Sequence, residues 1–179
     1  MSRGEREAGR RGKGQARRGG MAEPGCRIGT IASINISRKK GRAKTPVASV
    51  EIIAGEGIAD DAHRGFGHRQ VSLLMMESID ERRKAFREAA DAALIGPGAF
   101  AENLTTHGID LSRLAIGDEL VIRGESGDVG LKVTQIGKEC HTRCAIFKLT
   151  GDCIMPELGI FCEVLTGGTV RTGDRIERR

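Results

Sequence analysis

The sequence predicts a mainly β fold of the α+β class, with short strands in a barrel or sandwich and one long helix laid on it. Short apolar stretches separated by glycine turns recur along most of the 179 residues, which is typical of barrels and sandwiches. One stretch has the periodicity of a helix, and the chain is long enough for a single compact core. We therefore expect one β-rich domain.

The strands are expected where apolar residues alternate with polar ones or gather between turns. Their predicted ranges are 26–36, 47–54, 70–75, 100–104, 119–123, 131–136, 161–165 and 175–177. The helix is predicted over 76–94, because apolar residues recur there about every 3.6 positions and the charged residues lie mostly on the other face. Gly96-Pro97-Gly98 ends this helix.

The charge of the chain is concentrated at its beginning. Residues 1–20 hold seven Lys or Arg residues and two Glu residues, which accounts for the whole net charge of +5. We therefore divide the chain into a disordered basic Gly/Arg tail, residues 1–25, and one neutral domain, residues 26–179. The tail is expected either to touch RNA or acidic surfaces, or to precede a true start at Met21.

The composition excludes several classes of protein. Aromatic residues make up only 3% of the chain, with no Trp or Tyr, so a base-stacking nucleic-acid module is not expected. No apolar run is long enough for a membrane span, and no signal peptide is recognisable. Five cysteines, an odd number, suggest reduced thiols. We place the protein in the cytoplasm and expect neither a membrane nor a nucleic acid as its partner.

Cys140 is the strongest candidate for chemistry. It follows the strand predicted over 131–136 and lies between basic neighbours, in Lys138-Glu139-Cys140-His141. Nearby Lys or protonated His favours the thiolate, which is the form that binds metals and attacks electrophiles. Cys140 is therefore interpreted as a metal ligand or a nucleophile. The alternative is a buried structural cysteine.

The other cysteines allow a second interpretation of this region. The spacing from Cys140 is Cys-His-x2-Cys-x8-Cys-x8-Cys, ending at Cys144, Cys153 and Cys162. A zinc site usually has two close pairs of ligands, and this pattern has one, so a zinc or iron–sulfur site is the weaker hypothesis. Cys162 has the apolar neighbours of a strand core, and Cys144 is close enough in sequence to bridge to Cys140 or to resolve a persulfide.

Six segments occur together in an order that matches a known family. They are Gly57–His63, Arg69–Leu74, Phe100–Leu111, Ile116–Asp118, Lys138–His141 and Thr166–Asp174. Over about residues 26–178 the chain resembles the MOSC family, the molybdenum cofactor sulfurase C-terminal domain. The resemblance implies a β-rich barrel-like domain that binds the molybdenum cofactor, Mo held by molybdopterin, with Cys140 as Mo ligand or sulfur carrier. In multidomain members a separate pyridoxal-phosphate desulfurase mobilises the sulfur, and we expect no such domain in this chain.

Asp61 and His63 are candidate catalytic residues in a glycine-rich loop. An acid beside an imidazole can orient or deprotonate a neighbouring group. The alternative is an Asp that caps a turn and a surface His. The sequence departs from the family here, with Asp60 where Gly is expected before Asp61. A non-glycine residue is unfavourable there if the position requires a positive φ.

The candidate cofactor-binding residues are mostly basic or amide side chains. They are Arg69, Gln70, Glu102, Asn103, Thr105, Arg38, Lys44 and Gly168. Arg69 can bind a phosphate in a forked geometry, and Gln70 or Asn103 can pair with a pterin edge. Arg38 and Lys44 belong to a basic loop, residues 37–44, that with Lys39 and Lys40 offers a second candidate phosphate-binding cluster besides Arg69. The alternatives are solvated charges, Asx or ST turns around Glu102 and Thr105, and a simple turn at Gly168.

Three functional hypotheses follow. The first is a module that carries, stores, or helps to sulfurate or insert the cofactor, with cofactor-biosynthesis proteins or acceptor molybdoenzymes as partners. The second is a Mo-dependent reductase of N-hydroxylated compounds, which would need a separate electron donor because no dinucleotide-binding motif is present. The third is a metal-stabilised β domain that binds protein or RNA through its tail. We favour the first.

Overall fold

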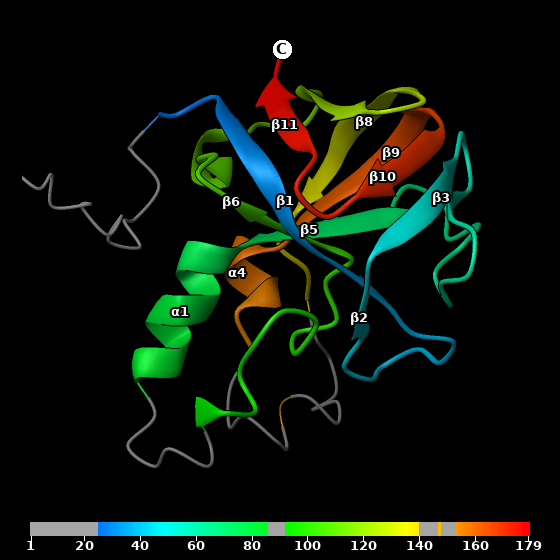
Figure 1. Cartoon of the computed structure of the whole chain (residues 1–179). Coiled ribbons are helices and arrows are strands. Elements are labelled where there is room, and N and C mark those ends of the chain that lie inside the picture. Colours follow the sequence, from blue (N-terminus) through cyan, green and yellow to red (C-terminus); the bar gives the residue numbers. More distant parts are fainter. Residues whose placement is uncertain (1–24, 86–91, 140–146, 148–152) are drawn as a thin grey trace, which may run out of the picture.

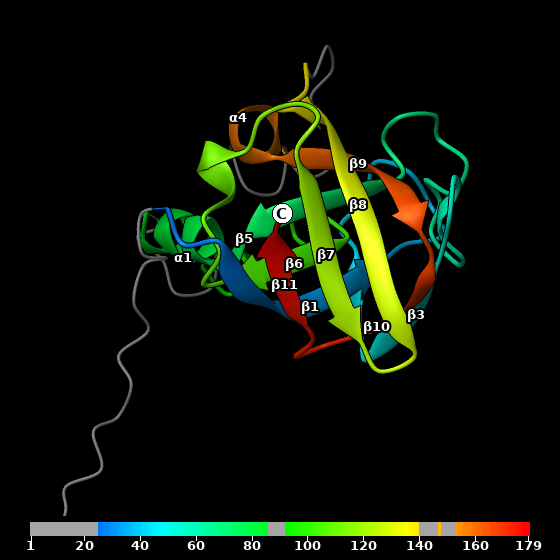
Figure 2. The same cartoon turned by 90° about the horizontal axis from the view of Figure 1, so that it is seen from above.

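A closed barrel of seven strands forms the core of the computed structural model, which describes residues 25–85, 92–139, 147 and 153–179 (Figures 1 and 2). Around the barrel the strands follow the order β11-β7-β8-β9-β5-β6-β1, and β1 pairs back with β11. Their bounds are β1 Ile28–Ile36, β5 Val71–Met75, β6 Leu104–His107, β7 Glu119–Gly124, β8 Gly127–Ile136, β9 Ile160–Thr166 and β11 Arg175–Arg178. The predicted barrel-like β fold is confirmed.

The remaining strands and helices lie outside the barrel. β2 (Thr45–Val47) extends the sheet beyond β1, and β10 (Gly168–Arg171), β3 (Ser49–Ile53) and β4 (Gly57–Ile58) form a separate three-stranded sheet. The helices are α1 (Met76–Lys84), the short 3₁₀ helix η1 (Leu111–Arg113) and α4 (Met155–Leu158). Figures 1 and 2 show α1 and α4 on one side of the barrel and β3 and β10 on the other.

β1 closes the barrel by pairing with two barrel strands, β11 and β6, and it also pairs with β2. Its first residues pair with β11, with Ile28 opposite Glu177, and its later residues pair with β6 and β2. The register against β6 shifts between Ile31 and Ser33, which marks a β-bulge. Because the bulge interrupts the alternation, Ile31 and Ile34 are both fully buried although they are three positions apart.

Two of the expected strands differ from the structure. The range 47–54 is divided at Ala48, because β2 pairs with β1 while β3 pairs with β10. The range 100–104 is a loop up to the last residue, where β6 begins. Phe100 is fully buried in this loop because the backbone folds around the carboxylate of Glu102, which accepts hydrogen bonds from two loop N–H groups. Phe100 is therefore apolar because it packs inside a loop, and not because it belongs to a strand.

The helix predicted over 76–94 begins at Met76 as expected. α1 extends to Lys84, and Ala85 keeps a right-handed helical conformation, while residues 86–91 lie outside the described part of the chain. α1 lies in the connection between β5 and β6, which run parallel with Leu73 opposite Leu104. A parallel pair needs such a crossover, because a tight turn can join only antiparallel strands.

Strand β5 and the first residues of β9, Ile160 to Cys162, are buried on both faces, and this arrangement positions the site. Their inward residues join the main core inside the barrel, as Leu73 and Cys162 do. The alternate residues Leu74 and Phe161 point outward into a second apolar cluster, which also contains Ile79 of α1 and other buried residues. The outer wall of β5 and β9 is thus covered by α1, α4 and loops. Within the described residues, no helix is both long and apolar enough to cross a membrane.

Candidate functional site

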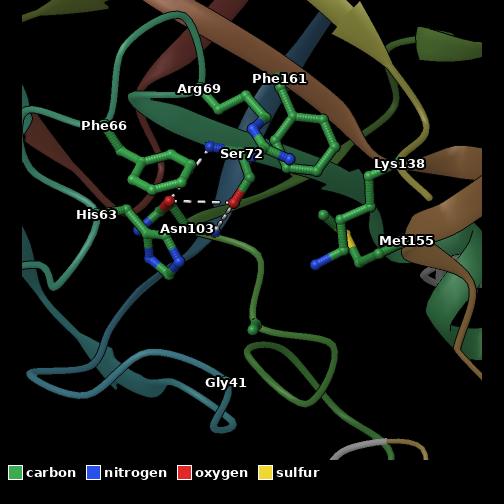
Figure 3. A pocket seen from close by; sticks show the side chains of 10 residues that line it. Gly41, His63, Phe66, Arg69, Ser72, Asn103, Lys138, Met155 and Phe161 are labelled. Atoms are coloured by element: carbon green, nitrogen blue, oxygen red, sulfur yellow. Dashed lines mark hydrogen bonds between the residues drawn. The ribbon is translucent and has the colours of Figure 1, made fainter. Parts of the chain in front are cut away.

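A pocket of about 200 Å³ lies against this outer wall, where several loops meet (Figure 3). Its lining residues come from six separate segments of the chain. They are Gly41, His63, Phe66, Arg69, Ser72, Ala101, Asn103, Lys138, Met155 and Phe161. Ser72 and Phe161 reach the pocket because the two-residue period of β5 and β9 directs them outward, and Lys138 follows the end of β8.

The pocket is cationic on an apolar background. Arg69 and Lys138 contribute positive charge, and none of the described residues that line the pocket is acidic. The Nε atom of Arg69 is buried without a hydrogen-bond partner among the described residues. Phe66 and Phe161 supply aromatic surface beside these charges. Such a lining suits a ligand that joins an anionic group to a flat or apolar body.

Asp61 lies next to the pocket, and its carboxylate accepts four hydrogen bonds. Its Oδ2 atom accepts from Nζ of Lys44 at 2.6 Å and from the backbone N–H of Ser37 at 3.1 Å. Its Oδ1 atom accepts from the backbone N–H of His63 at 3.0 Å and from Nδ1 of the same ring at 3.1 Å. The side chains of Lys44 and Asp61 are each only 1% exposed. The carboxylate is therefore fully engaged within the protein.

These contacts determine the ionisation of the pair and the orientation of His63. Burial alone would raise the pKa of Asp61, but the hydrogen bond from His63 and the charge of Lys44 outweigh it and hold the pKa below its usual range. Burial lowers the pKa of Lys44, against the opposing attraction of Asp61. Because an ionised carboxylate only accepts hydrogen bonds, Nδ1 of His63 is the donor. The other ring nitrogen, Nε2, is left for the pocket.

The Lys44–Asp61 pair also ties three loops together around the pocket. Asp61 accepts from Ser37 of the basic loop, and the N–H of Ala62 donates to the Ser37 carbonyl at 2.8 Å. The N–H of Lys44 donates to the carbonyl of Gly98 at 2.8 Å. Gly98 has a φ of 84°, and a Cβ atom there would lie 2.3 Å from the Lys44 carbonyl oxygen. Glycine is therefore required for this close approach.

Glu102 stabilises the third loop from inside the protein. It is fully buried, and its carboxyl group accepts from the N–H of Gly98 at 2.5 Å, the N–H of Phe100 at 3.2 Å and Oγ1 of Thr105 at 3.0 Å. Thr105 accepts in turn from Nδ2 of Asn35 at 3.1 Å. Burial raises the pKa of Glu102 to about 7, although the hydrogen bonds that it accepts oppose the shift. This buried polar chain supports the loop that carries Ala101 to the pocket.

Three of the predicted site residues, His63, Arg69 and Asn103, line the pocket together. Asn103 also links strands, since its Oδ1 accepts from the N–H and the hydroxyl of Ser72 and its Nδ2 donates to the Asn35 carbonyl. Asp61 contacts the pocket through His63. The structure thus groups an imidazole and a guanidinium from one loop with an amide from another segment.

The other predicted residues lie elsewhere, or their side chains are engaged in structural contacts. Gln70 donates to the carbonyls of Gly55 and Gly67 and accepts from the N–H of Val164, so its amide fixes the glycine-rich loop to β9. Arg38 is exposed in the basic loop, while Lys44 is buried with Asp61. Gly168 pairs with Ile52 in the separate three-stranded sheet. Glu102 and Thr105 are buried behind the pocket and do not line it. Cys140 and Cys144 lie outside the described residues.

The glycine expected before Asp61 is not required by the backbone. Asp60 is exposed and does not have a positive φ, and among the described residues only Ala101 is a non-glycine residue with a positive φ, at 65°. The loop therefore accepts Asp60 without the conformational cost anticipated from the sequence.

The sequence analysis missed several pocket residues, above all Phe66, Lys138, Met155 and Phe161. Phe66 carried a signal, because it is one of five aromatic residues in the chain and lies between two glycines in a polar loop. Met155 and Phe161 resemble core residues, and both also belong to the second apolar cluster. Lys138 stood out only as a neighbour of Cys140. Nothing in the sequence distinguishes Lys138, Met155 and Phe161 from ordinary surface or core residues.

The described cysteines do not support a metal cluster. Cys162 is fully buried in the barrel core, as predicted, and burial raises its pKa above the usual range. Cys26 and Cys153 are partly exposed. In the part of the chain that the structure describes, no group of three or more His, Cys, Asp or Glu residues could hold a metal ion.

Several solved structures are similar to this chain in fold. The YuaD protein from Bacillus subtilis is similar in structure, with a TM-score of 0.66, 21% identity and coverage of 84% of this chain and 95% of that one. YiiM from Escherichia coli has a TM-score of 0.61 and 18% identity, over 84% of this chain and 69% of its own. YiiM from Geobacillus stearothermophilus has a TM-score of 0.61 and 20% identity, over 84% and 75% of the two chains. At these identities the likeness shows the fold alone.

A comparison with curated protein sequences found no match. The family model of the MOSC domain matches residues 60–177, which is more than half of the chain and includes Asp61, His63, most of the pocket and Cys140. The chain therefore belongs to the MOSC domain family.

Proposed function

We propose that this domain holds the molybdenum cofactor in the pocket described above, with Cys140 as the Mo ligand or as a carrier of the cofactor's sulfur. The family to which the chain belongs is associated with the molybdenum cofactor. The observation that carries the proposal is the cationic pocket, in which the described residues supply no acidic side chain and no hydrogen-bond partner for Arg69 Nε. One of its lining residues is Lys138, only two residues before Cys140 in the sequence. A thiolate is a suitable soft ligand for such a metal centre.

The pocket residues fit the chemical parts of this cofactor. Molybdopterin combines a flat pterin, a sulfur-rich metal end and a terminal phosphate. Arg69 and Lys138 would hold anionic groups, since a guanidinium and an ammonium form charge-assisted hydrogen bonds with oxyanions. Phe66 and Phe161 offer aromatic surface to the ring system. When bound, the group would supply a metal centre for sulfur or oxygen chemistry, which none of the side chains provides.

The protein's own contribution is orientation and proton handling. Asp61 fixes the His63 ring through Nδ1, so Nε2 can form a hydrogen bond with a bound ligand or exchange a proton with it. The Lys44–Asp61 pair keeps this arrangement rigid because both side chains are buried. Within the proposed function, cofactor-biosynthesis proteins or acceptor molybdoenzymes are the partners from which the domain receives the cofactor or to which it delivers it.

The variant Cys140→Ser tests this proposal. We expect protein purified anaerobically from molybdate-fed cells to contain Mo and pterin, and the variant to retain at least about tenfold less Mo, because the hydroxyl is a much poorer soft ligand. Elemental analysis for Mo, Zn and Fe and a pterin fluorescence assay measure this. The melting temperature should change little, so a loss of cofactor would not reflect unfolding.

A matched control is Cys26→Ser, which replaces a partly exposed cysteine outside the pocket. This variant should retain as much Mo as the original protein. Normal Mo content in Cys140→Ser would contradict the assignment of Cys140. Stoichiometric Zn or Fe without pterin in the original protein would contradict the cofactor proposal and support the structural-metal hypothesis.

A further inference from the structure

Phe66 is unusual because it is exposed and yet is contacted by several polar side chains. The Phe66 side chain is 38% exposed and belongs to neither apolar cluster. Nζ of Lys40 lies 4.4 Å from the centre of its ring, and Cζ of Arg69 lies 5.0 Å from it. The ring of His63 packs edge-on against Phe66 at a centroid distance of 6.0 Å. Figure 3 shows Phe66, His63 and Arg69 around one end of the pocket.

The two cations on this ring come from different loops and have no acidic partner among the described residues. Lys40 belongs to the basic loop after β1, whereas Arg69 ends the glycine-rich loop before β5. No ion pair joins either of them to a carboxylate among the described residues, although ion pairs are common elsewhere on the surface. Two like charges near one ring repel each other, and the negative face of the ring offsets only part of this repulsion.

We propose that Phe66 is a positioning residue that holds Lys40 and Arg69 as a two-cation clamp for the terminal phosphate group of the pocket's ligand. An oxyanion between the two side chains would relieve their repulsion and would accept a hydrogen bond from the unpartnered Nε of Arg69. The identity of the ligand rests on the proposed function, whereas the clamp itself requires only a phosphate group.

The arrangement gives the pocket two distinct ends. Phe66 and Arg69 line the clamp end of the pocket, and Lys40 lies over the Phe66 ring beside it. Lys138, two residues before Cys140 in the sequence, lines the same pocket after the end of β8 (Figure 3). A ligand whose phosphate is bound at the clamp would have its opposite part directed toward Lys138. The clamp thereby selects ligands with a terminal phosphate and fixes their direction in the pocket.

Inorganic pyrophosphate is a suitable probe, measured by isothermal titration calorimetry on the full chain prepared from cells grown without molybdate. We expect saturable binding that weakens about tenfold in Phe66→Leu, because the ring no longer holds the two cations. Lys40→Ala and Arg69→Ala should weaken binding by a similar factor. Phe66→Trp should restore binding to within about threefold of the original protein, because the indole ring also attracts cations.

Lys39→Ala is the matched control. Lys39 is an exposed cation of the same loop without a ring contact, so its loss should change the affinity less than about twofold. The double variant Phe66→Leu/Lys40→Ala should bind more tightly than the product of the two single effects predicts, because Phe66 acts partly through Lys40. The melting temperature of Phe66→Leu should be unchanged, which separates positioning from a structural role.

Several outcomes would overturn the clamp. They are the absence of saturable pyrophosphate binding, an unchanged affinity in Phe66→Leu, and a Phe66→Trp variant that binds as weakly as Phe66→Leu. Cofactor content separates this proposal from the previous one. If the protein retains Mo and pterin but its pyrophosphate affinity does not depend on Phe66, the clamp is rejected and the cofactor proposal stands. The expected pyrophosphate results without any retained pterin would support the clamp and assign the pocket to another phosphorylated ligand.

Discussion

Replacing Lys44 with Met is expected to lower the free energy of unfolding by about 3–5 kcal/mol, because it leaves Asp61 as a buried charge without its cation. Asp61 is 1% exposed, so water cannot replace the ammonium group. The three remaining hydrogen bonds, from Ser37 and His63, solvate the carboxylate only partly. The three loops held by this pair should loosen as well. Urea unfolding followed by circular dichroism measures the effect.

Two further variants identify the cause. Lys39→Met removes an exposed cation of the same loop and should change the stability by less than about 0.5 kcal/mol. Asp61→Asn in the Lys44→Met background removes the unpaired charge, so the double variant should lose less stability than the sum of the single losses by about 1–3 kcal/mol. Strictly additive losses would show that the pair is not coupled and that Lys44 contributes through packing alone.

Glu102 should make the protein less stable as the pH rises from about 4.5 to about 7. Its pKa is raised from 4.5 to about 7 in the folded protein, so between these values the folded state binds more protons than the unfolded state. The contribution of Glu102 to the free energy of unfolding is fully present below pH 4.5, decreases as the pH rises through about 7, and is lost above it. A shift of this size corresponds to about 3 kcal/mol. Unfolding free energies measured across this range test the prediction.

Glu102→Gln should remove this pH dependence, because an amide of nearly the same shape does not titrate. Glu102→Ala should cost about 3 kcal/mol or more at any pH, since it leaves the N–H groups of Gly98 and Phe100 and the hydroxyl of Thr105 without their acceptor. Glu81→Gln, at an exposed position of α1, is the control and should keep the original pH profile. An unchanged profile in Glu102→Gln would assign the pH dependence to other groups.

The barrel strands were largely predictable because each has its own local pattern. The alternation in β8, the looser alternation in β1 and the apolar runs of β5, β7 and β9 are visible in the sequence alone. The closure of β1 onto β11 was not predictable, because pairing between distant strands leaves no local signal. The division of the range 47–54 at Ala48 has the same origin, since two different partner strands determine it.

The candidate site shows a similar division between chemistry and placement. The loop of Asp61 and His63 and the charge of Arg69 were recognisable from residue type, and the structure places His63 and Arg69 in one pocket. Lys44 was expected to be a solvated or phosphate-binding cation, yet it is buried 17 positions before its partner Asp61. Lysine is rarely buried in proteins, so the sequence around Lys44 gives no reason to expect its burial beside Asp61. Gln70 was selected for its amide, and three structural hydrogen bonds occupy that amide.

The pairing of Ile28 with Glu177 joins strands from nearly opposite ends of the chain, and this affects how the protein is made. On the ribosome, β1 is synthesised before the other described strands of the barrel, and the four residues of β11 that cover its edge are synthesised after them. Until then β1 and β7 each have an unpaired edge, and such edges recruit other strands. Closure of the barrel therefore comes late in synthesis, and the unpaired edges are open to pairing with other chains until then.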